Sequence, residues 1–215
     1  MHGGRDTAPP RGILRAMAPL QPPAFWSLLT HAAGTQALPD WSTAERAITT
    51  HTVLAGGTVF LQGVQHPYVY TVQEGLFKLS YLQDDGTEWI KSFAEEGRFF
   101  ASVSALQPGG RTAFMVTAIE SATLERIDHG VLLALAERHL PWAKALYQLT
   151  LVYAARKETR ERELLTLNAE GRYRAFLASH PDLALRIPQK DLARHLGLTP
   201  VGLNRIAMRV RRSVT

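Results

Sequence analysis

Residues 188–211, PQKDLARHLGLTPVGLNRIAMRVR, carry the pattern of two short helices joined by a tight turn. In the first helix, Leu192, Ala193 and Leu196 share one face, which we expect to be buried because apolar residues at helical spacing form the packed side. The polar residues of this helix are expected to lie outside that face: Lys190, Asp191, Arg194 and His195. Gly197 suits the turn, since glycine readily adopts the left-handed conformation common at helix ends.

The second helix has a start signal of its own. Thr199 is a good N-cap, and Pro200 fits the first helical turn, where its missing N–H needs no partner. Leu198, Leu203 and Ile206 are then expected to face inward. The open side of the helix holds Val201, Gly202, Asn204, Arg205 and Arg209. Two helices arranged in this way are typical of a DNA-reading unit.

The charge of this region separates a DNA-reading unit from the alternative, an ordinary pair of packed amphipathic helices. Residues 186–212 contain seven Lys or Arg and one Asp, whereas the whole chain has a net charge of +5. The basic charge is therefore confined to this segment, and a phosphate backbone attracts such a patch. The distribution favours DNA binding.

The pattern of these two helices resembles that of a known group of proteins. The spacing of the apolar and glycine positions is similar to the helix-turn-helix of bacterial regulators in the CRP/FNR superfamily, and LGLTPVGLNRI is similar to their recognition-helix signature. These positions are Leu192, Ala193, Leu196, Gly197, Leu198, Leu203 and Ile206. The residues that we predict to contact DNA are Lys190, Thr199, Pro200, Val201, Gly202, Asn204, Arg205, Arg209, Arg211 and Arg212.

Within that set we distinguish base readers from phosphate contacts. Arg205 matches the base-reading Arg of the superfamily and has the geometry to bind guanine O6 and N7. Many relatives carry Glu where Val201 stands, so an apolar contact to a thymine methyl is expected there instead. The arginines further along the helix are expected to meet phosphates. The alternative is that all of them, Arg205 included, meet only phosphates.

Composition excludes several other classes of protein. The 215-residue chain is 46% hydrophobic and 20% charged, and it contains no Cys, which excludes disulfides, thiolate zinc sites and Cys-held iron–sulfur clusters. It lacks a run of 18 apolar residues and a secretory signal pattern, so we predict a soluble cytoplasmic protein without membrane contact. Five prolines within residues 1–24 predict a flexible leader, in which Met17 is an alternative start.

Residues 52–127 consist of short apolar runs separated by turns. This pattern predicts an antiparallel β-roll or jelly roll. Asp85-Gly86 is the best hairpin turn, and residues 25–29 and 42–50 are expected to form flanking helices. The segment resembles the sensor domain of the same superfamily, so residues 25–140 are assigned to it and the likeness covers about residues 52–211. The matching positions are Gly57, Phe60, Gly63, Tyr70, Gly75, Asp85, Gly86, Gly97, Ala118 and Leu124.

The effector loop departs from the superfamily pattern. Members that bind cyclic AMP have a Phe-Gly-Glu loop followed by Arg-Ser/Thr-Ala, whereas residues 99–102 here read FFAS and residues 111–113 read RTA. The arginine is kept and the ribose-binding carboxylate is absent, so cyclic AMP is not the expected effector. Candidate residues for an unknown small-molecule effector are Phe99, Ser102, Arg111 and Thr112. The alternative is that Arg111 is a surface residue beside the turn Gly109-Gly110.

No other chemistry is supported by the sequence. The eight histidines are scattered without the spacing of a metal or haem site, so we predict no metal and no cofactor. Ser102 and Ser104 lack a nucleophile-elbow setting. We therefore expect a protein that is not an enzyme.

Residues 141–165 form the longest helical pattern. Trp142, Leu146, Leu149 and Tyr153 recur at alternating spacings of four and three, which predicts a coiled-coil seam. The resemblance makes this helix the dimer interface; the alternative is packing against its own β-roll, and Leu151 with Val152 supplies a second apolar side. The pattern breaks at residues 167–168, which gives a helix and hinge over 141–168 and a DNA-binding domain over 169–215.

These observations predict an α+β fold: an N-terminal β-roll sensor, a long dimerisation helix and a C-terminal, winged-helix-like helix-turn-helix domain. The resemblance implies a homodimeric transcription regulator whose partners are an inverted-repeat operator in double-stranded DNA, a second copy and RNA polymerase. The rival from another class is an effector-binding or scaffold module with nonspecific nucleic-acid contact. The chain ends soon after the second helix, so the strands of a wing are not evident.

Overall fold

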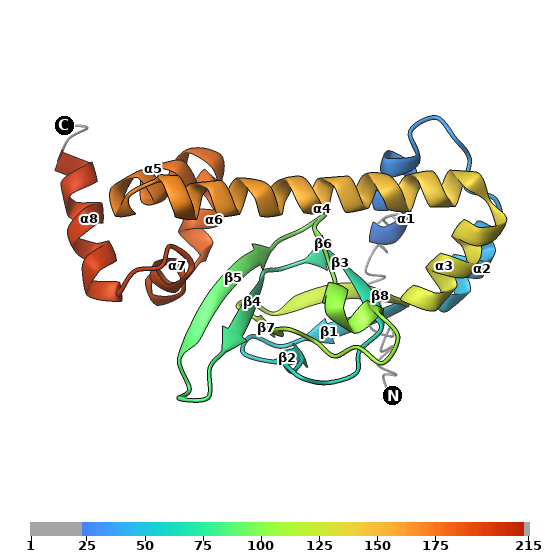
Figure 1. Cartoon of the computed structure of the whole chain (residues 1–215), viewed down its shortest axis with the longest axis horizontal. Helices are drawn as coiled ribbons and strands as arrows, with labels where there is room; N and C mark the ends of the chain where they lie inside the picture. The colour runs from blue at the N-terminus through green and yellow to red at the C-terminus, as the bar shows by residue number, and fades with distance from the viewer. Residues whose placement is uncertain (1–22, 213–215) are drawn as a thin grey trace, which may run out of the picture.

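The computed structural model describes residues 23–212. Its longest element, α4 (Leu140–Thr166), runs along the molecule, with a roll of antiparallel strands beside it and helices at both ends (Figure 1). The α+β class predicted from the sequence, with its β-roll and C-terminal helix-turn-helix region, is confirmed. The predicted leader over residues 1–24 lies almost wholly outside the described residues, and Ala24 already belongs to the first helix.

The β-roll consists of two four-stranded sheets, ordered β1-β8-β3-β6 and β2-β7-β4-β5, with every pairing antiparallel. The strands are β1 (Thr49–Val53), β2 (Thr58–Phe60), β3 (Tyr68–Glu74), β4 (Phe77–Leu82), β5 (Glu88–Ala94), β6 (Phe99–Phe100), β7 (Met115–Ala118) and β8 (Ala122–Asp128). A 3₁₀ turn, η1 (Val103–Leu106), follows β6.

The core of the roll is rich in aromatic rings, and both sheets contribute them. Tyr70 stacks on Phe100 with ring centroids 5.1 Å apart, and Phe60 lies 5.7 Å from Phe114. The predicted hairpin turn joins β4 and β5: the Asp85 carboxylate accepts the Thr87 N–H at 2.8 Å, and Gly86 has φ 82°. The buried aromatic side chains of the core remove large apolar areas from water, and this stabilises the roll without a disulfide.

Two short helices precede the roll, α1 (Ala24–Ala33) and α2 (Trp41–Ala47). The predicted helix over residues 42–50 was too long at its C-terminal end, because residues 49 and 50 pair with β8 as the start of β1. The N-terminus of α1 is held by a buried carboxylate of β8: Glu125 accepts the backbone N–H groups of Ala24 at 3.0 Å and Phe25 at 2.9 Å. A carboxylate at this end of a helix is favoured by the helix dipole.

Helix α4 follows α3 (His129–Arg138) and begins by inserting a side chain into its own domain. Trp142 is fully buried, and its indole N–H donates to the Pro39 carbonyl at 2.7 Å. Leu146 and Leu149 pack against the same core. The prediction that Trp142 contacts a second copy is therefore wrong. Trp142 packs within its own chain, but mainly against the flanking helices and less against the β-roll, which was the stated alternative.

The C-terminal region is helical: α5 (Ala169–Ser179), α6 (Pro181–Arg186), α7 (Gln189–His195) and α8 (Pro200–Arg212). Asn168 caps α5 by accepting the Gly171 N–H at 2.8 Å, next to the predicted domain boundary. Among residues 23–212 no strand follows β8, so the described part of this region has no wing. The region resembles a winged helix only in its helices.

Candidate nucleic-acid interface and effector cavity

Two backbone hydrogen bonds in the turn between α7 and α8 cap the C-terminal end of α7. The Leu198 N–H donates to the Ala193 carbonyl at 2.9 Å, and the Gly197 N–H donates to the Arg194 carbonyl at 3.4 Å. This pair of bonds requires a left-handed residue at Gly197, where φ is 70°. Thr199 then caps α8, since its hydroxyl accepts the Gly202 N–H at 3.1 Å.

Helix α8 has one buried face and one open face. Leu203 and Ile206 are buried, as the sequence predicted, together with Ala207 and Val210. Val201 is 64% exposed, and the predicted base readers Asn204 and Arg205 are exposed beside it. Lys190 on α7 is also exposed. The open face thus presents polar and basic side chains at the end of the molecule.

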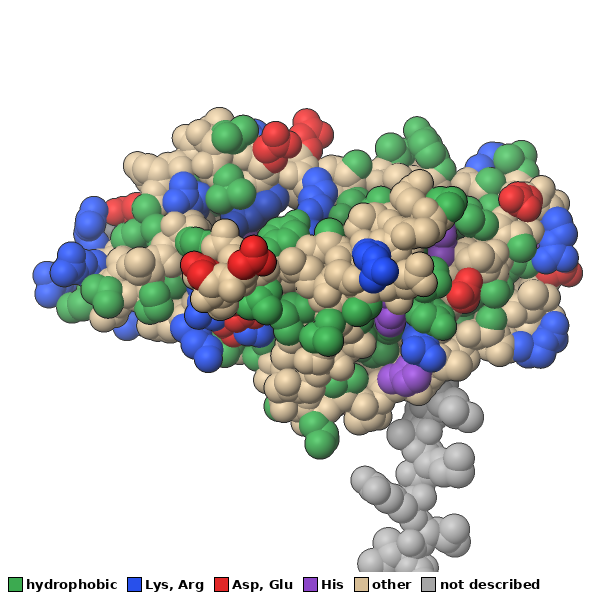
Figure 2. Space-filling view, turned by 60° about the horizontal axis from the view of Figure 1, so that its bottom comes forward, with side chains coloured by type: hydrophobic (Ala, Val, Ile, Leu, Met, Phe, Trp, Pro, Cys, Tyr) green, Lys and Arg blue, Asp and Glu red, His purple; other side chains and the backbone are tan. Residues whose placement is uncertain are grey.

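The basic charge of the C-terminal region divides between two surfaces. Lys and Arg side chains gather at the left end of Figure 2, the end that carries α8 in Figure 1. Arg209 lies on α8 and pairs with Glu170 at 3.3 Å. Arg186 and Arg194 instead pair with carboxylates of the β-roll. Two of the seven basic residues counted in the sequence therefore lie at the domain junction.

The junction places α7 against β5. The guanidinium of Arg186 pairs with Glu96 at 2.9 Å and with Glu120 at 2.6 Å. Arg194 pairs with Glu88 at 2.8 Å. The hydrogen bonds from Arg186 lower the pKa of Glu96 to about 2. The pairs join the C-terminal region to the turns and strands of the roll.

Two residues of α7 that were expected on an open face are buried at this junction. Asp191 lies 3.6 Å from the Lys78 ammonium, and His195 donates from Nδ1 to the Ile90 carbonyl at 3.3 Å. Burial, followed by the nearby Arg160 charge, lowers the pKa of His195 to about 3, so the ring is neutral. The expectation was wrong because helical periodicity identifies the face packed within a domain and not a face covered by another domain.

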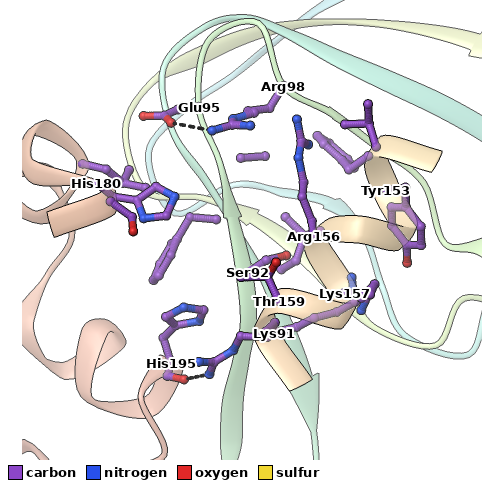
Figure 3. Close-up of a pocket in the computed structure, with 18 of the residues that line it drawn as sticks. Lys91, Ser92, Glu95, Arg98, Tyr153, Arg156, Lys157, Thr159, His180 and His195 are labelled. Carbon is purple, nitrogen blue, oxygen red and sulfur yellow. Dashed lines mark hydrogen bonds and ion pairs between the residues drawn. The ribbon is translucent and has the colours of Figure 1, made fainter. Parts of the chain in front are cut away.

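A cavity of about 590 Å³ lies where the roll, α4 and the C-terminal helices meet (Figure 3). Its walls come from β5, β6, α4, α5 and α7. Five Lys or Arg side chains line it, against two carboxylates, Glu95 and Glu163. The five cations are Lys91, Arg98, Arg156, Lys157 and Arg160. The sequence did not reveal this cluster, because its members are scattered over 70 residues without a motif.

The environment of the cavity changes the ionisation of its cations. Burial, with Lys157 beside it, lowers the pKa of Lys91 to about 7. Burial and the neighbouring Arg98 also lower the pKa of Arg156. Both shifts arise first from burial and second from a neighbouring positive charge, so these cations are partly withdrawn from solvent.

The β-roll matches a known family. The family model "Cyclic nucleotide-binding domain" matches residues 50–139, which is less than half of the chain. This segment is similar to cyclic nucleotide-binding domains. No curated protein matches the chain in sequence.

Solved structures share the fold of most of the chain. FixK2 from Bradyrhizobium japonicum is 21% identical, with a TM-score of 0.69 over 77% of this chain and 85% of that one. The c-di-GMP responsive global regulator CLP from Xanthomonas campestris is 18% identical, with a TM-score of 0.64 over 81% and 93%. The catabolite activator protein of Thermus thermophilus is 22% identical, with a TM-score of 0.51 over 86% and 87%. The fold that the predicted resemblance implies is therefore confirmed, because these structures share it.

Within residues 50–139, the predicted effector residues do not converge on the cavity. Phe99 lines it. The Thr112 hydroxyl donates to the Leu61 carbonyl at 2.6 Å and accepts the Val64 N–H at 3.0 Å, so its one O–H donor is used within the chain. Ser102 accepts the Ala113 N–H at 2.9 Å, and Arg111 donates to the Gly63 carbonyl at 2.9 Å. Arg111 is exposed beside the turn Gly109-Gly110, which agrees with the alternative given for it. A role of these residues in binding an effector stays a prediction.

Within residues 23–212, no helix is long and apolar enough to cross a membrane. The same residues contain no group of three or more His, Cys, Asp or Glu side chains that could hold a metal ion.

Proposed function

We propose that this protein is a homodimeric, sequence-specific DNA-binding regulator of transcription. The observation that carries the proposal is the capped helix α8 with an exposed polar and basic face, set on a helix-turn-helix beside a cyclic nucleotide-binding domain. Val201, Asn204 and Arg205 lie on the N-terminal half of that face, the part that reaches base edges in such motifs. Lys190, Arg209, Arg211 and Arg212 contact phosphates.

The remaining predicted contacts shape the approach to DNA. Thr199 caps α8, and Pro200 and Gly202 lie in its first turn, where small side chains let the backbone come close to the groove. The regulator has no catalytic role in this proposal. RNA polymerase is its protein partner at the promoter, which places it in the cytoplasm with the DNA.

Dimerisation is proposed through the outward side of α4 and not through Trp142. Tyr147 is 61% exposed and Leu151 is 44% exposed, and with Ala154 they recur at spacings of four and three. This spacing forms one seam of a two-stranded coiled coil. Leu149 and Tyr153 are half-buried and lie beside this seam. A two-fold axis along α4 would pair the two copies of α8 for an inverted repeat.

The experiment that tests the proposal is selection of bound duplexes from a random pool by the full chain. We expect an inverted repeat whose half-site centres are ~34 Å apart, or a multiple of that distance. The selected site should bind ~10³-fold or more tightly than random duplex at physiological salt. Equal binding of selected and random duplexes would reject the regulator and favour the scaffold with nonspecific nucleic-acid contact.

A further inference from the structure

Two lysines from different elements share one aromatic ring. Lys91 belongs to β5 and Lys157 to α4, and Figure 3 shows them beside each other. The Lys91 ammonium lies 5.8 Å from the centre of the Tyr153 ring, and the Lys157 ammonium lies 5.6 Å from the same centre. The fold therefore brings together two like charges that are far apart in the chain.

The groups that face Lys91 do not balance this charge. Within residues 23–212, no carboxylate oxygen lies within 4.0 Å of the Lys91 or Lys157 ammonium. A second ring, that of the buried Phe114, lies 4.4 Å from the Lys91 ammonium. Burial, followed by the nearby Tyr81, raises the pKa of Tyr153, so its phenol stays neutral. Lys91 thus faces a second cation and uncharged rings.

This environment makes Lys91 a neutral amine at slightly alkaline pH. Burial, and after it the charge of Lys157, lowers the pKa of Lys91 to about 7. At pH 8 the neutral fraction of such an amine exceeds that of an ordinary lysine by on the order of 100-fold. A desolvated lysine beside another cation is a nucleophile, because its lone pair is free to react.

We propose that Lys91 is a modification site for dissolved carbon dioxide, which it holds as a carbamate paired with the Lys157 ammonium. The Nζ lone pair attacks the carbon of carbon dioxide, so that an N–C bond forms and one C=O π pair moves onto oxygen. One N–H proton leaves to solvent, and the product carries one negative charge. The step needs no oxidant, reductant or leaving group.

The surroundings favour this adduct over a neutral one. An acyl group on Lys91 would give an amide, which has no charge to pair with Lys157. A carbamate replaces the like-charge contact by an opposite-charge contact, and such contacts are stronger where solvent is partly excluded. Carbon dioxide is small and uncharged, so it can reach an amine that lies between aromatic rings. Modification of Lys91 is measured without DNA, so its test is independent of the proposed function.

The test is to expose the full chain to isotopically labelled carbon dioxide at pH 8 and to trap the carbamate by ethylation with triethyloxonium. Peptide mass spectrometry then locates the label. The chain has four other lysines, Lys78, Lys144, Lys157 and Lys190, of which Lys144 and Lys190 are exposed and serve as internal controls. We expect the label on Lys91 to exceed that on either control by on the order of 100-fold.

Variants of α4 separate the effect of charge from that of the fold. Lys157→Gln should lower the label on Lys91 about tenfold or more, because it raises the pKa of Lys91 and leaves the carbamate unpaired. Lys157→Arg keeps a cation at this position and should retain most of the label. Lys144→Gln, on an exposed position of the same helix, is the matched control and should change nothing.

The wild-type chain supplies a further readout that no folding defect can mimic. At fixed dissolved carbon dioxide, the label on Lys91 should rise steeply between about pH 6 and pH 8, as the amine loses its proton. Label on Lys91 no greater than on Lys144, or label on Lys157 in place of Lys91, would overturn the proposal. Equal label in Lys157→Gln and in the wild type would contradict the pairing of the carbamate with Lys157.

Discussion

At the scale of single residues, position on α8 separates the arginines into two expected roles. Arg205 lies on the open face near the start of the helix, whereas Arg209 lies one turn later and pairs with Glu170 at 3.3 Å. A residue near the start of a recognition helix reaches base edges, and one further along meets the backbone. The two therefore form a natural pair for comparison.

We expect Arg205→Ala to cost about 1–3 kcal/mol on the preferred operator and to relax the preference at one base pair. Arg209→Ala should weaken binding to every sequence alike and reduce the salt slope by roughly 1. Binding isotherms on the selected site and on its single-base variants, each at several salt concentrations, measure both effects. Equal losses on all sequences for both variants would show that Arg205 does not read a base.

Lys91 has a pKa of about 7 in the folded chain, against 10.5 in the unfolded chain. Between these values the unfolded chain binds more protons, so stability rises with pH, and below pH 7 the folded chain bears the cost of a buried charge. We expect Lys91→Met to raise the free energy of unfolding by roughly 1–3 kcal/mol at pH 6. The gain should shrink toward pH 9. Urea unfolding at both pH values measures it, and a gain that grows with pH would contradict the assignment.

At the scale of elements, the start of α1 is held in place by one side chain of β8. Glu125 is buried, accepts two N–H groups from the start of α1, and also accepts the Gln73 side-chain amide at 2.7 Å. The sequence predicted a short helix here and gave no sign of its anchor, because the partners are about 100 positions apart.

Glu125→Ala should lower the free energy of unfolding by about 2–4 kcal/mol, because it leaves buried N–H groups unsatisfied and removes a charged acceptor. Glu74→Ala, at the exposed end of β3, is the matched control and should change stability by less than about 0.5 kcal/mol. Chemical denaturation measures both variants. Local loss of amide protection in α1 would locate the effect, and equal changes in the two variants would argue against the anchor.

At the scale of the whole molecule, α4 has two opposed apolar sides with different uses. Trp142 and Ala145 fill the core of their own chain, while Tyr147, Leu151 and Ala154 face outward. A helix that is apolar on two sides needs two partners. Helices α1 and α3 of the same chain supply one partner, and in our proposal a second copy supplies the other.

Leu151→Arg places a charge in the proposed seam and leaves the core of the chain untouched. We expect it to dissociate the dimer at micromolar concentration in sedimentation, because unpaired charges at a packed interface are strongly unfavourable. Lys144→Arg, a change without a new charge on the same helix, should leave the dimer intact. Persistence of a Leu151→Arg dimer would place the interface elsewhere.

The sequence by itself determined the order of the elements, the turn chemistry at Gly86 and Gly197, and the two faces of α8, because these depend on local backbone preference and on helical or strand periodicity. Tertiary structure decided which side of α4 is free, since Trp142 has the periodicity of a seam and only its contact with Pro39 shows that it packs inward. It also decided that Asp191 and His195 are buried and that five separated cations share one cavity. Contacts between domains join residues far apart in the chain, and no local pattern records them.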